Sequence, residues 1–70
     1  MADHSDHLDI ARRHVVEADA RILRQRLLLG EMRASGQPTE LARQLLASMV
    51  ETARQMRAHL VFLEREDRGA

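Results

Sequence analysis

The sequence contains no cysteine, lysine, tryptophan or tyrosine, and its only aromatic residue is Phe62. The absence of cysteine excludes a disulfide framework and leaves the redox compartment open. A chain of 70 residues forms at most one small domain, and such chains bury only about 60% of their unfolded surface. A core of this size usually needs a metal or a partner chain for stability when disulfides are absent.

The sequence also lacks an excess of charge of either sign and lacks long apolar runs. The eleven arginines are balanced by eleven acids, which gives a formal net charge of zero. No apolar run approaches the ~20 residues that a membrane-spanning helix requires. The first residues, "MADHSDHLD", are acidic and polar, unlike a signal peptide. We therefore expect a cytoplasmic protein without membrane association.

Glycine and proline are scarce, and they occur together only in "ASGQPTE", residues 34–40. Gly36 suits the left-handed position that follows a helix. Pro38 cannot continue that helix, and Thr39 is a favourable N-cap for a second one. Because this connection is short, the two helices are predicted to be antiparallel neighbours.

The chain is thus predicted to be one all-α helical-hairpin domain. Its expected parts are a first helix over about 5–35, a turn at 36–38 and a second helix over about 39–66, within a single domain of residues 1–70.

Apolar residues recur along both predicted helices with the alternating spacing of a coiled coil. We call this set the seam: Leu8, Ala11, Val15, Ala18, Ile22, Gln25, Leu29, Met32, Ala42, Leu46, Met49, Ala53, Met56, Leu60 and Leu63. Folding the chain at the turn places Leu29 opposite Leu46 and Ile22 opposite Ala53. Gln25 is the one polar member, for which three roles stay open: contact with a ligand, selection of the register, or a side chain that reaches outward.

A second apolar set lies about 150° around the first helix from the seam. We call it the outer stripe: Val16, Ala20, Leu23, Leu27, Gly30 and Ala34. Gly30, unfavourable inside a helix, indicates either a close helix crossing or a kink or early end of the helix. The second helix adds Leu41, Leu45, Val50, Val61 and Phe62 outside the seam.

One hairpin would leave these apolar side chains in water, and a contiguous exposed apolar patch marks an interface. We therefore predict a two-fold homodimer in which two hairpins form a four-helix bundle. The residues predicted to carry this association are Val16, Leu23, Leu27, Leu41, Leu45 and Phe62. Alternatively, part of this surface receives an amphipathic helix of another protein.

The arginines raise the alternative of nucleic-acid binding. Six lie on the first helix, at positions Arg12, Arg13, Arg21, Arg24, Arg26 and Arg33. Acids interleave with them, whereas a nucleic-acid interface usually shows a basic excess on one face. Three acid-before-base pairs at i,i+4 are predicted on the helix surfaces instead. They are Asp9 with Arg13, Glu17 with Arg21, and Glu64 with Arg68.

Histidines raise the other alternative, a metal site. His4 and His7 stand at i,i+3 near two aspartates, a spacing that can place both rings on one metal. The competing interpretation is a polar helix start whose acids suit the helix dipole. His14 and His59 are expected at the same level of the hairpin but on opposite flanks, which disfavours joint action.

Residues 22–49 resemble a set of small uncharacterised bacterial proteins predicted as helical hairpins. The shared residues are Ile22, Arg24, Gln25, Gly36, Thr39, Ala42, Leu45 and Leu46. The resemblance implies a hairpin fold, with no assigned activity and no site residues.

Elements of an enzyme are missing as well. The sequence has no glycine-rich phosphate loop, no serine with a convergent histidine and aspartate, and no Glu-x-x-His pair. We expect a protein without enzymatic activity or cofactor that acts through protein–protein interaction.

Overall fold

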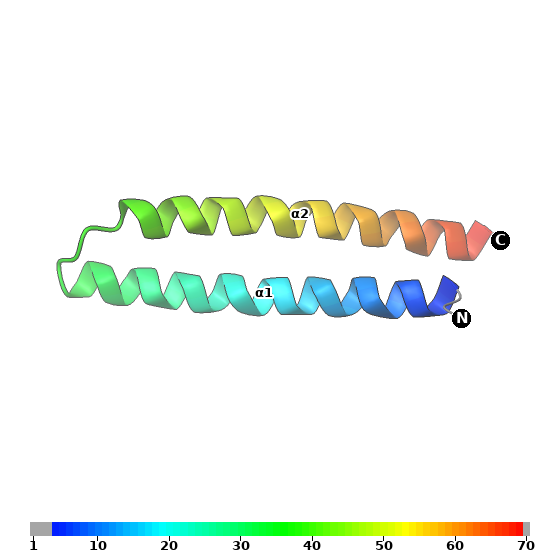
Figure 1. Ribbon diagram of the computed structural model, residues 1–70, viewed down its shortest axis with the longest axis horizontal. Coiled ribbons are helices and arrows are strands. Elements are labelled where there is room, and N and C mark those ends of the chain that lie inside the picture. The colour runs from blue at the N-terminus through cyan, green and yellow to red at the C-terminus, as the bar shows by residue number, and fades with distance from the viewer. Residues whose placement is uncertain (1–3, 70) are drawn as a thin grey trace.

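Two antiparallel helices joined by one turn make up the computed structural model, with the start of α1 and the end of α2 together at the other end (Figure 1). The structure describes residues 4–69. Helix α1 spans His4–Ala34 and helix α2 spans Glu40–Gly69. The predicted all-α hairpin is therefore confirmed, and the helix bounds agree closely except at the end of α2.

The turn after α1 closes through backbone hydrogen bonds. The Gln37 N–H donates to the Met32 carbonyl at 2.9 Å, and the Gly36 N–H donates to the Arg33 carbonyl at 3.2 Å. Gly36 has φ 74°, a left-handed conformation that costs glycine no Cβ clash. These features form a Schellman motif, in which the otherwise unpaired carbonyls at the helix end accept hydrogen bonds. Gly36 was correctly placed from the sequence for this reason.

The end of α2 lies at Gly69, beyond the predicted end near residue 66. The acids Glu66 and Asp67 are unfavourable there, because a helix C-terminus carries a partial negative charge. Arg68 offsets them as the basic residue of the last turn. Its Nε donates to the Glu64 carbonyl at 3.4 Å, so a late carbonyl gains a cationic donor.

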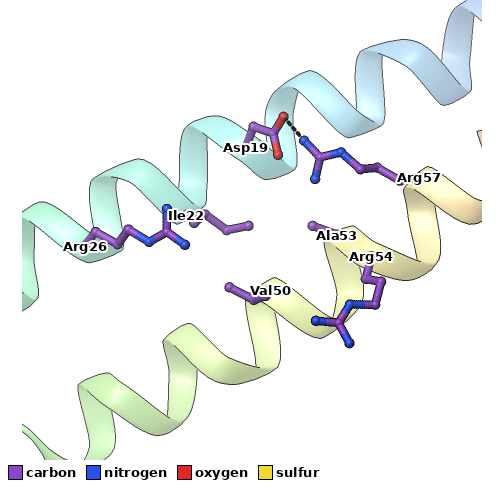
Figure 2. A pocket seen from close by; sticks show the side chains of 7 residues that line it. All are labelled: Asp19, Ile22, Arg26, Val50, Ala53, Arg54 and Arg57. Atoms are coloured by element: carbon purple, nitrogen blue, oxygen red, sulfur yellow. Dashed lines mark hydrogen bonds and ion pairs between the residues drawn. The ribbon is translucent and has the colours of Figure 1, made fainter.

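The predicted seam is confirmed, because every one of its residues is buried or half-buried. Ala18, Ile22 and Ala53 form the central cluster, and side chains of α2 pack against it. Ile22 and Ala53 point toward one another between the helices (Figure 2). A bulky side chain thus faces a small one, so the two surfaces interdigitate and the helices approach closely.

Gln25, the polar member of the seam, is 9% exposed. Its side-chain amide donates to the Ala42 carbonyl of α2 at 3.0 Å. A buried polar group is costly unless it is hydrogen-bonded, and this contact satisfies it while linking the helices. Gln25 therefore helps to select the helix register, and neither a ligand contact nor an outward-reaching side chain is needed to account for it.

The hairpin is a thin rod with a small interior. It measures 54 × 17 × 16 Å and has a radius of gyration of 16.1 Å, whereas a compact chain of this length has about 11 Å. Only three large hydrophobic side chains of the described residues are buried: Leu8, Ile22 and Leu29. Two helices side by side have no second layer to cover their outer surfaces, so the rest of the apolar side chains contact water.

Candidate interaction surface

Large apolar side chains are more numerous on the surface than in the interior. Nine lie exposed among the described residues, against the three that are buried: Ile10, Val16, Leu23, Leu27, Leu28, Leu41, Leu45, Val61 and Phe62. All six residues predicted to carry association belong to this exposed set. The structure therefore shows that the hairpin itself does not use them as core.

The largest regular part of this surface is the outer stripe of α1. Val16, Leu23 and Leu27 are exposed by 67%, 59% and 61% of their surfaces. Their spacing places them on one side of α1, away from the seam that packs on α2. The smaller members of the stripe, Ala20 and Ala34, are also exposed. The result is a row of large and small apolar residues along the back of α1, in which Leu23 and Leu27 are neighbours.

Gly30 lies within this row and has no role inside the chain that requires glycine. Its φ is not positive, and a Cβ added there would meet nothing within 4 Å. Helix α1 continues through Gly30 to Ala34, so the helix does not end early there. Glycine in a helix interior costs about 1 kcal/mol relative to alanine. No contact or backbone conformation within the hairpin offsets this cost, which favours the predicted close crossing by another helix.

The three predicted association residues of α2 lie apart from the outer stripe. Leu41 and Leu45 lie one turn apart at the start of α2, beside the turn, while Phe62 lies within the last eight residues of the same helix. Leu41 is the most exposed of all, at 80%. The six residues thus occupy separate surfaces, and a single flat interface along α1 would contain only Val16, Leu23 and Leu27.

One flank of the hairpin is lined by arginines; we call it the arginine flank. Asp19 of α1 pairs with Arg57 of α2 beside the seam, and Arg26 and Arg54 border the same shallow groove (Figure 2). Toward the open end, Arg12 pairs with Glu64 across the helices at 3.6 Å. These ion pairs are half-exposed, so each contributes only about 0.2–1 kcal/mol.

None of the three predicted i,i+4 pairs forms, and Glu17 and Arg21 take part in no ion pair among the described residues. Asp9 pairs with Arg12 at 3.7 Å, not with Arg13. The Glu64 carboxylate pairs with Arg12, while Arg68 contacts only the Glu64 carbonyl. Glu64 pairs with Arg12 of the other helix because the antiparallel packing brings the long Arg12 side chain within reach of the Glu64 carboxylate.

The opposite flank carries the histidines, and here the prediction is wrong. His14 and His59 were expected on opposite flanks, but with His7 they line one shallow groove. In an antiparallel pair, equivalent heptad positions of the two helices meet on the same side of the seam. The available signal was that His14 and His59 each directly precede a seam residue, Val15 and Leu60, and so occupy equivalent heptad positions.

No metal site emerges from the histidines in the part of the chain that the structure describes. Residues 6–69 contain no group of three histidine, cysteine, aspartate or glutamate side chains arranged to hold a metal ion. The side chain of His4 lies outside the described ones. His7 is exposed on the histidine-bearing flank, so the predicted His4–His7 pairing stays untested.

The arginines do not form one basic face. Arg12, Arg54 and Arg57 each pair with a carboxylate. Eleven acids balance the eleven arginines over the whole chain, although Arg21, Arg24 and Arg26 follow one another without an acid between them. Such an arrangement weighs against the phosphate-binding alternative, which needs an unbalanced positive surface. Within residues 4–69, neither helix combines the length and the apolar character of a membrane span.

Comparison with protein-family models, curated proteins and solved structures finds no match. The hairpin fold implied by the resemblance of residues 22–49 is confirmed by the two helices themselves. The candidate function therefore depends on the surface just described.

Proposed function

We propose that this protein works by association, as a non-enzymatic helical hairpin that forms a homodimer through the outer stripe of α1 and acts as an interaction module. The observation that carries the proposal is the stripe itself, with Val16, Leu23 and Leu27 each more than half exposed. Covering one such side chain stabilises the covered state by about 1.5–3 kcal/mol. A second copy doubles this gain, because a two-fold interface buries the same residues on both chains.

The total surface supports the same conclusion. The chain exposes 5456 Å², whereas a compact monomer of 8.0 kDa exposes about 4,500 Å². The excess is about 1,000 Å², and a stable complex buries about 800 Å² per partner. The surplus thus matches the area that one dimer contact removes from water.

A second copy is favoured over a foreign helix because no separate partner is needed to supply the complementary apolar row. Each chain already carries an apolar row of matching length. The same surface would accept an amphipathic helix of another protein only in competition with this dimer.

The proposal is tested by measuring native mass with light scattering at micromolar concentration. Wild type is expected at twice the 8.0 kDa chain mass. Leu27→Asp is expected to run as a single chain, because a dimer would bury its unpaired carboxylate. Gln55→Asp is the matched control: it makes the same change of charge at an exposed position in the middle of α2 and should remain dimeric.

Two outcomes would contradict the proposal. One is a wild-type chain of monomeric mass that still melts cooperatively. The other is a Leu27→Asp variant that keeps the dimeric mass with unchanged circular dichroism, because the outer stripe would then lie in water in the assembly.

A further inference from the structure

The outer stripe has the spacing of a second coiled-coil seam. Its members, from Val16 to Ala34, alternate by four and three residues, as the seam against α2 does. Helix α1 therefore has two such rows on opposite sides. In a closed four-helix bundle, the helices stand at the corners of a rough square, so each contacts its neighbours on faces about 90° apart. Opposite rows fit a flat layer instead, with the two α1 helices in the middle.

Charged residues border the outer stripe on both sides. On the side of the arginine flank they are Arg12, Asp19, Arg26 and Arg33, and on the other side they are Glu17, Arg24 and Glu31. Such bordering residues set the orientation of a coiled coil through their pairing across the interface. The order of their signs can therefore be compared for the two orientations of a dimer.

A parallel pair of α1 helices matches every sign. In that orientation, each residue of the first border as far as Arg26 contacts the residue of the second border five positions further along the other copy. The contacts would be Arg12 with Glu17, Asp19 with Arg24, and Arg26 with Glu31. Each occurs twice by symmetry, and all join opposite charges.

An antiparallel pair in the register that overlaps the whole stripe places like charges together. Because each border then meets the same border of the other copy, Arg24 lies beside Arg24, Arg26 beside Arg26, and Glu17 beside Glu31. One opposite-charge contact remains, Asp19 with Arg33, and the like-charge contacts outnumber it. Like-charge contacts across an interface suppress that arrangement. The pattern therefore distinguishes the two orientations clearly.

The in-chain contacts leave most of these border charges available, while Arg12 pairs with Glu64 and Asp19 with Arg57 inside the hairpin. Among the described residues, Glu17, Arg24, Arg26 and Glu31 take part in no ion pair within the hairpin. Arg26 and Glu31 also have no charged residue three or four positions away on α1. We propose that two copies pack α1 against α1 in parallel, forming a flat four-helix layer whose orientation is selected by these border charges. This inference rests on the proposed dimer and adds its geometry.

Cysteine cross-linking reads the orientation directly, since the natural chain has no cysteine. Val16→Cys should form a disulfide-linked dimer under mild oxidation, because a parallel pair places residue 16 against itself. In a mixture of Val16→Cys and Ala34→Cys, only 16–16 and 34–34 links should form. Residues 16 and 34 would lie about 27 Å apart in the parallel dimer, well beyond the reach of a disulfide.

A predominant 16–34 link would overturn the parallel arrangement while leaving the dimer intact. A monomeric mass for wild type would instead overturn the proposed function, so the two failures are distinguishable. Gln55→Cys on α2 is the control position and should remain unlinked, because α2 lies at the outside of the layer.

Charge exchange supplies an independent readout by sedimentation equilibrium. Arg26→Glu and Glu31→Arg should each weaken the dimer about tenfold, because each turns two attractive contacts into repulsive ones. The double variant should recover affinity to within about threefold of wild type. An antiparallel dimer gives the opposite sign for Glu31→Arg, which would then bind more tightly by relieving the repulsion with Glu17. Tighter binding, or a double variant as weak as the singles, would overturn the proposal.

Discussion

The two faces of α1 are built from similar residues and have different surroundings. On the inner face, Ile22 is 8% exposed against α2, and one residue further along, Leu23 is 59% exposed on the outer face. Ile22 and Leu23 have similar size and hydrophobicity, so these properties do not explain the difference in exposure. What separates them is the presence of one neighbouring helix and the absence of a second.

This difference teaches that an apolar row on a helix becomes core only when a partner faces it. The inner face contains Ala18 and the hydrogen-bonded Gln25, which suit the shape and the polar atoms of α2. The centre of the outer face has no polar side chain that needs water as a hydrogen-bond partner. It also includes Gly30, which is unfavourable in an isolated helix. An outer face composed in this way is suited to packing against another surface.

The largest expected contrast is between alanine substitutions on the two faces. Ile22→Ala should lower the free energy of unfolding by about 2–5 kcal/mol, because it opens a cavity against Ala53. Leu23→Ala should change it by less than about 0.5 kcal/mol in dilute samples where the chain is monomeric. Urea unfolding followed by circular dichroism measures both. Equal losses at all concentrations would remove the distinction between the faces.

A smaller effect is expected at Gly30. Gly30→Ala should stabilise the dilute monomer by about 1 kcal/mol, because alanine favours the helix and its Cβ meets nothing in the chain. The same variant should weaken the dimer, since the added Cβ would occupy the space in which the second helix crosses. Unfolding at low and high protein concentration separates the two effects. A dimer of unchanged or higher affinity would rule out a close crossing at Gly30.

The smallest effect is expected on the arginine flank. Asp19→Asn removes the pair with Arg57, in which both side chains are about half exposed. The free energy of unfolding should fall by only about 0.2–1 kcal/mol, and the difference should shrink at high salt. A loss above 2 kcal/mol, independent of salt, would show that this flank contributes to the core of the hairpin.

Much of the fold was predictable because its determinants are local. The repeat along each helix and the glycine at position 36 are both visible in the sequence, and they predicted the seam and the turn. The cross-helix pair of Arg12 with Glu64 was not predictable from spacing within one helix, because it depends on the reach of the side chains across the seam. The misplacement of His14 and His59 has the same origin in the antiparallel arrangement.

The candidate surface was predictable only in part. Val16, Leu23 and Leu27 lie together as the helical period requires, but Leu41, Leu45 and Phe62 lie elsewhere, because helical period says nothing about how surfaces on different helices join. Ile10, exposed by 47%, was not anticipated, since it belongs to neither apolar row. Which molecule covers the outer stripe depends on more than this chain. In the sequence of one chain, only the charges that border the stripe bear on the partner that we propose.

The most direct test is an isotope-filtered NOE experiment on a sample in which half of the chains are ¹³C-labelled. It detects methyl contacts only between copies. We predict cross-copy contacts among the methyl groups of Val16, Leu23 and Leu27, with Leu23 near Leu23 and Leu27 near Leu27 of the second copy. The absence of any cross-copy contact from these three residues, in a sample that is dimeric by mass, would contradict the claim that the outer stripe is the surface of association.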